Sequence, residues 1–292
     1  MKVIGFGDNI VDRFLDRKVM YPGGNCVNVA VLARRLGVES AYLGVFGSDP
    51  LGDFVRGALQ DEGVDVSRCV IREGPNGVTE IRVVDGDRIF LGWNDGGVTM
   101  SHPFVLEPEH LDYLATADLV HSSVYSASES QLPAVRTAGT LVSFDYSSEQ
   151  ERRTDAYLQQ TAPFIDLALL SLGSQPLDAV ERDLRRLVAA GASLAVGTRG
   201  ASGAVLFDGS DFLIQGAVAT DAGRFADTMG CGDAFLSGLV VSLLKAGWTR
   251  RFRPSASCLR EALAFAAVAA AEQCYVEGAF GYGRPAAAPT RI

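Results

Sequence analysis

Lysine is scarce in this sequence, which contains only Lys2, Lys18 and Lys245. None of them stands between a glycine and a serine or threonine, so the phosphate-binding loop of P-loop enzymes is absent. The lysine-containing and His-Arg-Asp signatures of protein kinases and the Gly-x-Ser-x-Gly elbow of α/β-hydrolases are absent as well. These absences exclude the first two enzyme classes and argue against the third.

Cysteine and histidine are also sparse. The chain has three histidines and five scattered cysteines, with no Cys-x-x-Cys pair. A zinc cluster needs several such ligands at short spacing, so none is expected. An odd number of widely spaced thiols predicts no disulfide framework and a reducing compartment.

A basic excess and a long apolar run are missing too. The 26 basic residues are outnumbered by 35 acidic ones, which gives a net charge of −9 and argues against a nucleic-acid partner. No apolar run reaches the roughly 18–20 residues that span a bilayer. The first dozen residues carry acidic groups, unlike a secretory signal, so we expect a cytoplasmic protein without a membrane partner.

The residues that are present form a strand–helix alternation. Of the 292 residues, 48% are hydrophobic, enough for a large core. Apolar runs predict buried strands, and segments with helical spacing lie between them. The strands are expected near 2–8, 40–47, 118–123, 140–147, 166–171 and 193–200. The helices are expected near 25–37, 49–63, 175–191 and 236–247. This order predicts an α/β fold over residues 1–292, a doubly wound, mainly parallel sheet with helices on both faces.

Two stretches, residues 11–22 and about 69–99, interrupt the alternation. Their short runs are separated by Pro-Asn-Gly, Asp-Gly-Asp and Asn-Asp-Gly-Gly, which are hairpin signals. They predict a small antiparallel β sheet beside the main body. Such a sheet can cover a ligand and exclude water. A hairpin without a function is the alternative.

The strongest motif is Asp-Thr-Met-Gly-Cys-Gly-Asp-Ala-Phe at 227–235, which leads directly into an apolar helix. The first turn of a helix offers unpaired N–H groups and a partial positive charge, and glycines allow close approach of an anion. Asp233, in that turn, is therefore favoured as an anion and would lie beside a bound phosphate. This combination suits a base that deprotonates a hydroxyl during phosphoryl transfer. A capping aspartate at a glycine turn is the alternative.

A second motif, Gly-Gly-Asn-Cys-Val-Asn-Val-Ala at 23–30, also enters a helix. Asn25 and Asn28 lie one turn apart on one face, and their amides can bind sugar hydroxyls. N-capping, the alternative, accounts for Asn25 but not for Asn28.

A third motif, Gly-Asp-Asn-Ile-Val-Asp at 7–12, follows the first strand, where open α/β sheets bind ligands. Asp12 is the candidate ligand there, and an exposed loop acid is the alternative. An overlapping stretch, Gly-Phe-Gly-Asp-Asn-Ile at 5–10, begins like a dinucleotide fingerprint, but Ile10 stands where its last glycine or alanine would be, which disfavours a dehydrogenase.

Together the three motifs resemble those of the ribokinase (PfkB) family of sugar and nucleoside kinases, and the resemblance covers nearly the whole chain. It implies an ATP-dependent carbohydrate kinase of ribokinase fold, with the small β sheet as a lid over the sugar. It makes Asp233 the catalytic base and the amides of Gly230, Cys231 and Gly232 the anion hole for the γ-phosphate. Residues 265–274 and the turn at 278–279 correspond to the adenine end of the pocket.

The resemblance also implies the ligand contacts. Asp12, Gly24 and Asn28 match residues that bind sugar hydroxyls. Thr198 and Gly200, in Val-Gly-Thr-Arg-Gly, match the nucleotide side of the pocket. Lids in such proteins can pair between subunits, which makes a homodimer through the lid an open alternative to a monomer.

This chain departs from the family pattern at two places. Cys231 replaces the usual alanine, and a thiol at a helix N-terminus is expected to react with alkylating reagents unless ATP protects it. The family's Asn-x-x-Glu stretch, which organises Mg²⁺, would fall at 174–177, where the sequence reads Ser-Gln-Pro-Leu. Mg²⁺ is expected with ATP, but the sequence names no ligand for it.

Within the family, the segments at 7–12, 23–31, 117–125 and 143–147 look most like those of bacterial fructoselysine 6-kinases. That resemblance implies transfer of the γ-phosphoryl group to a primary hydroxyl of a fructosamine-type sugar. Charged residues of the predicted lid, Glu80, Arg82, Asp87, Arg88 and Asp95, would permit such a charged substrate. Phosphorylation of fructose, ribose, a keto-deoxy sugar or a nucleoside remains open, as does a non-catalytic regulator on the same fold.

Two further polar residues end predicted strands. His121 stands beside Ser122 and Ser123 but lacks the context of a hydrolase, so a structural histidine is expected. Asp145 either faces the phosphates or begins a turn.

Overall fold

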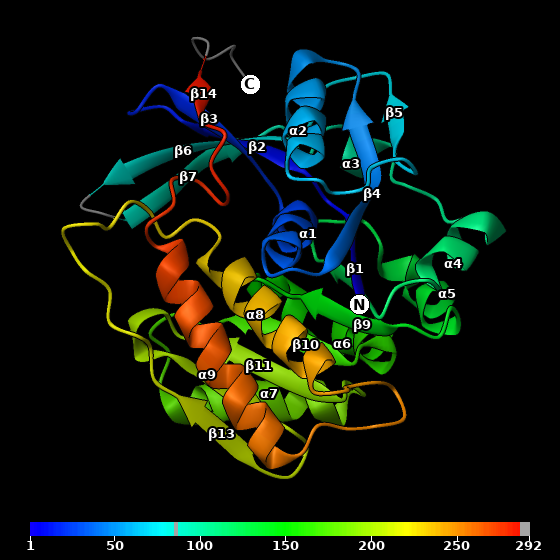
Figure 1. Ribbon diagram of the computed structural model, residues 1–292, viewed down its shortest axis with the longest axis vertical. Coiled ribbons are helices and arrows are strands. Elements are labelled where there is room, and N and C mark those ends of the chain that lie inside the picture. The colour runs from blue at the N-terminus through cyan, green and yellow to red at the C-terminus, as the bar shows by residue number, and fades with distance from the viewer. Residues whose placement is uncertain (85–86, 287–292) are drawn as a thin grey trace.

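The computed structural model describes residues 1–84 and 87–286. Its main element is a nine-stranded sheet in the order β13-β12-β11-β10-β9-β8-β1-β4-β5 (Figure 1). All neighbours from β11 to β5 pair in parallel, and β12 and β13 extend the sheet as antiparallel strands. The strand bounds are β1 Lys2–Gly7, β4 Glu39–Gly47, β5 Val70–Arg72, β8 Leu119–Ser123, β9 Leu141–Asp145, β10 Leu167–Ser171, β11 Leu194–Thr198, β12 Ala204–Phe207 and β13 Phe212–Gln215. The predicted mainly parallel α/β sheet is confirmed.

Helices cover both faces of this sheet because its strands are apolar on both sides. In β1, Val3 packs toward α8 and α9, whereas Ile4 and Phe6 pack toward α5, α6 and α7. Figure 1 shows α1, α8 and α9 together on one face. The helix bounds are α1 Asn25–Arg35, α2 Pro50–Asp61, α3 Val98–Ser101, α4 Pro108–Leu114, α5 Leu132–Thr137, α6 Asp155–Thr161, α7 Leu177–Ala189, α8 Cys231–Lys245 and α9 Ala256–Gln273.

Local sequence explains where the predicted helices begin and end. Asp49 caps α2 by accepting a hydrogen bond from the backbone N–H of Gly52 at 3.0 Å, and Pro50 occupies the first helical position. Beyond the end of α1, Gly37 takes φ +83°, a conformation that glycine adopts at little cost. Among the described residues no helix has the length and apolarity that a bilayer crossing requires.

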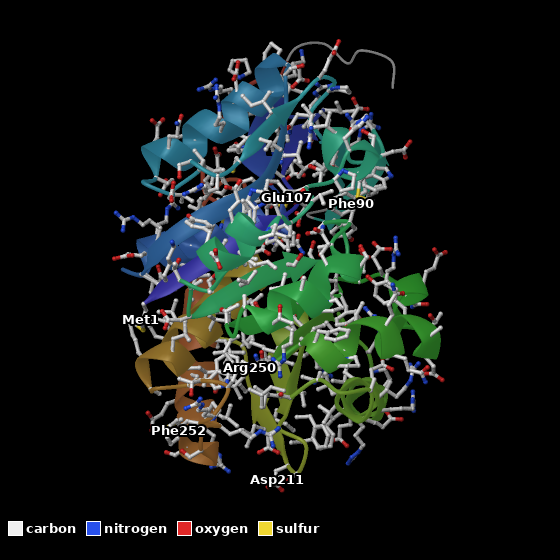
Figure 2. All side chains as sticks on the ribbon, turned by 90° about the vertical axis from the view of Figure 1, so that its right-hand side faces the viewer. Met1, Phe90, Glu107, Asp211, Arg250 and Phe252 are labelled. Atoms are coloured by element: carbon white, nitrogen blue, oxygen red, sulfur yellow. The ribbon has the colours of Figure 1, made fainter. Side chains whose placement is uncertain are left out.

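A second, five-stranded sheet lies beside the first, in the order β14-β3-β2-β6-β7. The bounds of its strands are β2 Ile10–Phe14, β3 Val19–Gly23, β6 Val78–Val84, β7 Asp87–Trp93 and β14 Arg284–Pro285. Figure 1 shows this sheet above the end of α9, and Figure 2 shows Phe90 of β7 far from Asp211 at the other end of the molecule. We call this five-stranded sheet the lid.

The lid differs from the prediction in three respects. β2 pairs with β6 in parallel, because the chain passes through β4, α2 and β5 before it returns, so the sheet is mixed and not antiparallel. Within the predicted lid segment 69–99, β5 pairs with β4 and belongs to the main sheet. The lid also contains β14, which the sequence did not predict. Residues 85–86 of the predicted segment lie outside the described residues.

Candidate active site

Two acidic side chains are buried at the carboxyl edge of the main sheet. Asp8 follows β1 and is 5% exposed, and Asp145 is the last residue of β9 and is 6% exposed. Parallel strands end at one edge, which is where α/β sheets bind ligands. Asp145 also accepts a hydrogen bond from the backbone N–H of Ser147 at 2.6 Å, so it begins a turn, and its burial places it at the edge where a ligand would bind.

Asp233 reaches the same edge from the first turn of α8. Gly230 caps this helix with φ +75°, and a Cβ there would lie 2.9 Å from Cα of Ala279, so the close approach requires glycine. The capping residue Gly230 has no side chain, and Asp233 is the acidic residue of the first turn. Its partner is Asn28, whose Nδ2 donates to Oδ2 of Asp233 at 2.8 Å.

The proposed anion-hole residues form the start of this helix. The N–H of Ala234 donates to the carbonyl of Gly230 at 2.8 Å, so the helical hydrogen bonds begin there. The N–H of Cys231 donates to the carbonyl of Thr228 at 3.3 Å, which gives this amide an internal partner that the sequence did not predict. At Gly232 a Cβ would meet no atom within 4 Å, so space lies open beside this residue.

α1 connects the acidic residues through its two asparagines. Asn25 donates from Nδ2 to Oδ2 of Asp145 at 2.7 Å, and Asn28 binds Asp233. Asn25 lies inside the helix, Gly24 is the cap, and no side-chain bond caps it, so N-capping does not explain Asn25. Oδ1 of Asn28 has no hydrogen-bond partner among the described residues although it is buried. Such an acceptor suits a ligand hydroxyl.

Asp12 faces Asn28 across the glycine pair that precedes α1. A Cβ on Gly23 would lie 2.6 Å from Oδ2 of Asp12 and 3.8 Å from Oδ1 of Asn28, so both side chains border the same small space. Asp12 is 6% exposed and belongs to β2, which contradicts the alternative of an exposed loop acid. Gly24 takes φ +109° and contacts Asp8, since a Cβ there would lie 2.9 Å from Oδ2 of Asp8.

We call Asp8, Asp12, Asp145 and Asp233 the carboxylate cluster. Burial raises the pKa of Asp233 well above its usual value; the negative charges of Asp145, Asp8 and Asp12 raise it further, and the Asn28 hydrogen bond opposes the shift. Burial likewise raises the pKa of Asp145 to about 7, with Asp8 adding to the shift and the Ser147 N–H and Arg153 opposing it. The expected stabilisation of the Asp233 anion by the helix is therefore outweighed by burial and like charge.

Serines of β8 and the following turn hold Asp8. The hydroxyls of Ser123 and Ser126 donate to its Oδ1 at 2.7 and 2.8 Å. His121 is fully buried with Nδ1 2.9 Å from the hydroxyl of Ser143, and burial lowers its pKa to about 4. The structural interpretation of His121 fits this position.

Thr198 and Gly200 lie farther along the same edge. Thr198 ends β11, two strands from β9, which corresponds to about 10 Å at ordinary strand spacing. Gly200, with φ +53°, begins the turn after this strand. Both residues lie at the same edge as Asp8 and Asp145. Among the described residues, no hydrogen bond or ion pair links them to the carboxylate cluster.

The lid contacts the loop before α8 and the segment after α9. Arg17, between β2 and β3, pairs with Asp227 at 3.4 Å, and the hydroxyl of Tyr21 donates to Oε2 of Glu277 at 2.9 Å. Of the charged lid residues, Glu80 pairs with Arg13 at 3.4 Å, and Arg82 and Asp95 are exposed. The side chains of Asp87 and Arg88 lie outside the described set.

The sequence analysis assigned no role to several residues that contact the site or its surrounding loops, namely Arg17, Tyr21, Ser126 and Glu277. No local pattern distinguishes these residues, because each contacts a segment that is distant from it in the sequence.

The fold and this site define the class of protein, an ATP-dependent carbohydrate kinase with a ribokinase-like fold. The chain belongs to the pfkB family of carbohydrate kinases, whose model matches residues 15–281. It is 36% identical to the fructosamine kinase FrlD of Bacillus subtilis, over 98% of this chain and 95% of that protein.

Further relatives are also sugar kinases. The chain is 31% identical to fructoselysine 6-kinase of Shigella flexneri, over 94% of this chain and 97% of that protein. A fructokinase of Klebsiella pneumoniae is 31% identical over 84% and 85% of the two chains. Fructokinase of Xylella fastidiosa, solved with bound ATP, has a TM-score of 0.75 at 20% identity over 96% and 94% of the two chains.

Proposed function

We propose that this kinase transfers the γ-phosphoryl group of ATP to a primary hydroxyl of a fructosamine-type sugar, with Asp233 as the catalytic base. The observation that carries the proposal is the position of Asp233. Its buried carboxylate stands in the first turn of α8 and is held by Asn28, which borders the same small space beside Gly23 as Asp12 does. One carboxylate is thereby adjacent both to a space for sugar hydroxyls and to helix N–H groups.

In the proposed reaction, Asp233 accepts the proton of the sugar hydroxyl as its oxygen attacks the γ-phosphorus and ADP leaves. A carboxylate with a raised pKa is a stronger base than an ordinary aspartate, which favours this step. Amides of residues 230–232 would stabilise the charge on the transferred group, with Gly232 in the most open position. The lid would exclude water, the competing acceptor.

Asp12, Gly24 and Asn28 are the proposed sugar contacts. The buried Oδ1 of Asn28 would accept a hydrogen bond from a sugar hydroxyl, and Asp12 would accept a second. Thr198 and Gly200 are the proposed nucleotide contacts, together with the turn at 278–279, which packs against Gly230.

Mg²⁺ is the proposed companion of ATP, and the donor set fits it. Burial raises the pKa of Asp145, the negative charge of Asp8 raises it further, and a bound cation would offset both effects. The turn at 174–177 holds no carboxylate, and the described residues contain no group of three or more metal-binding side chains. Asp145 is therefore the residue that would hold the ion, with triphosphate oxygens and water as further ligands. Bound there, the ion would neutralise charge on the phosphates.

The carboxylate cluster also supports an aminated substrate. A fructosamine carries a protonated amine next to its sugar ring, and the ionised members of this buried cluster attract such a cation more than they attract neutral fructose. The identities to a fructosamine kinase and a fructoselysine 6-kinase point the same way.

A substrate panel tests the proposal. Purified protein is given MgATP with fructoselysine, other N-substituted fructosamines, fructose, ribose or a nucleoside, and ADP formation is followed. We expect kcat/KM for fructosamines to exceed that for fructose by about 100-fold or more. Carbon and phosphorus NMR of the product identifies the phosphorylated hydroxyl. A preference for fructose or a nucleoside would refute the substrate class, and tight binding of both ligands without turnover would favour a regulator.

Asp233→Asn tests the catalytic base. The amide keeps the shape and the hydrogen-bonding capacity but cannot accept the proton, so we expect turnover to fall by about 10²–10⁴-fold with affinities for ATP and sugar changed only severalfold. Asp53→Asn, an exposed position in α2, is the control and should retain normal turnover. Near-normal turnover of Asp233→Asn would remove Asp233 from the proposed role.

We also propose a homodimer formed through the lid. β7 ends the lid sheet and carries four exposed apolar side chains, Ile89, Phe90, Leu91 and Trp93. An apolar strand at a sheet edge is a site for pairing with another chain, and a second copy supplies the same edge.

A further inference from the structure

Two cysteines that are distant in the sequence meet at the start of α8. The sulfurs of Cys231, the first residue of α8, and Cys274, directly after α9, lie 3.4 Å apart. Both side chains are partly exposed, so a small reagent can reach them. None of the protein's cysteines is joined in a disulfide.

The pair lies where the end of α9 supports the loop that precedes α8. The carbonyl of Cys274 accepts hydrogen bonds from the N–H groups of Ala226 and Asp227 at 2.9 and 3.3 Å. Beside it, Nε2 of Gln273 donates to the carbonyl of Met229 at 3.1 Å and to that of Gly278 at 3.2 Å. A change in the position of either cysteine is therefore transmitted to residues 226–231.

We propose that Cys231 and Cys274 form a reversible disulfide that slows phosphoryl transfer, which makes the pair an oxidative modification site. The inference rests on the proposed function in one respect, the assignment of residues 230–232 as the anion hole. The oxidant is a low-molecular-weight disulfide. The thiolate of one cysteine attacks it and releases one thiol; the thiolate of the second cysteine then attacks the mixed disulfide and releases the other. Two protein thiols are oxidised and one external disulfide is reduced to two thiols.

Bond formation must draw the two sulfurs from 3.4 Å to the bonding distance of about 2.05 Å. The first residue of α8 then moves toward α9, and with it the amides that face the proposed phosphate position. Sites of this kind tolerate displacements of only about 0.5 Å, and a shift of about 1 Å can cost a factor near 100 in rate. We therefore expect the oxidised protein to turn over about 10–100-fold more slowly.

The other three cysteines differ from this pair, so we expect oxidation to occur selectively at Cys231 and Cys274. Cys26 is fully buried, and burial raises the pKa values of Cys26 and Cys69, which disfavours their thiolates. Cys258 lies near the start of α9, away from the site, and serves as a matched control.

The test uses full-length protein treated with excess oxidised glutathione and then with dithiothreitol. Mass spectrometry of intact protein and of peptides should show a loss of about 2 Da and a cross-link between the peptides of Cys231 and Cys274. Turnover should fall and return on reduction. ATP binding, measured by calorimetry, should weaken in the oxidised form, a readout that does not depend on which sugar is the substrate.

Variants complete the test, each compared with its own reduced form. Cys274→Ser should lose both the cross-link and the response to oxidant, whereas Cys258→Ser should keep both. If Cys274→Ser fails to fold, Cys231→Ser serves the same purpose. No Cys231–Cys274 cross-link at saturating oxidant, or a cross-linked protein with unchanged turnover and ATP affinity, would overturn the proposal. Failure of the reduced protein to phosphorylate any sugar would refute only the proposed function, because cross-linking and ATP binding are measured independently.

Discussion

The individual residues of the site are defined by their neighbours more than by their own chemistry. Asp233 stands in a helix turn that favours an anion, yet burial and the charge of Asp145 raise its pKa. The hydrogen bond from Asn28 opposes part of the pKa shift of Asp233, and Asn25 from the same helix binds Asp145. Such a carboxyl group exchanges its proton nearer to neutral pH, as a general base requires.

This pKa shift predicts a pH dependence. Catalysis needs Asp233 deprotonated, so kcat/KM should fall as the pH drops, with an acid limb well above the pKa near 4 of an ordinary aspartate. Asp145 has a pKa of about 7 and interacts with Asp233. The apparent pKa of the acid limb therefore describes the titration of the two carboxyl groups together. Rates measured between about pH 5 and 9 locate it.

Asp145→Asn is the matched variant for this pH profile. It removes a negative charge next to Asp233, which lowers the pKa of Asp233 and should move the acid limb to lower pH. Asp178→Asn, in the first turn of α7, is the control and should leave the profile in place. If the acid limb of Asp145→Asn lies at the same pH as that of the wild-type protein, the electrostatic coupling between Asp145 and Asp233 is contradicted.

Among the elements, α1 organises the site. It begins at Gly24, packs on β1 and α8, and presents Asn25 and Asn28 to the carboxylate cluster. The glycine pair lets the end of β3 and the start of α1 pass close to Asp8 and Asp12. Position and register of this helix thus depend on two residues without side chains.

We predict that Gly24→Ala destabilises the protein. Its φ of +109° disfavours any side chain, and the new Cβ would lie 2.8 Å from Cα of Asn9. Strain and overpacking together should lower the free energy of unfolding by about 2–4 kcal/mol. Urea denaturation followed by circular dichroism measures the change.

Gly57→Ala is the matched control for that measurement. Gly57 lies inside α2, where a Cβ would meet no atom within 4 Å. Alanine there should raise the free energy of unfolding by about 0.5–1 kcal/mol, because it restricts the unfolded chain. If Gly24→Ala and Gly57→Ala change the free energy of unfolding equally, the backbone conformation at Gly24 does not require glycine.

At the scale of the whole molecule, the edge of the main sheet carries Asp145 and Thr198, α8 carries Asp233, and the lid carries Asp12. The lid reaches the loop before α8 through Arg17 and Asp227, and the segment after α9 through Tyr21 and Glu277. Its outer edge, β7, leaves apolar side chains exposed.

This exposed edge predicts a dimer in solution. Light scattering after size-exclusion chromatography should give twice the chain mass of 31.0 kDa. Phe90→Glu, at a residue 63% exposed on β7, should produce monomer because a charge would be buried in the interface.

Phe252→Glu is the control, at an aromatic residue 71% exposed in a different part of the surface (Figure 2). It should leave the dimer intact. A monomeric wild-type protein at micromolar concentration would refute the lid interface.

The sequence by itself determined the parallel α/β sheet, the three motifs and an apolar helix expected near 236–247, which begins at Cys231 in the structure. These features depend on local patterns: apolar periodicity, glycine at positive φ, and the polarity of helix starts. It also predicted correctly that Asn25 and Asn28 share a face, because a helix fixes that relation.

Only the tertiary structure decided which groups meet. It joined Asn28 to Asp233, set Cys274 against Cys231, paired β2 with β6 in parallel and assigned β5 to the main sheet. It also reversed the expected ease of ionisation of Asp233. The physical reason is that burial and contacts between distant segments depend on how the whole chain packs, and no local pattern of residues encodes them.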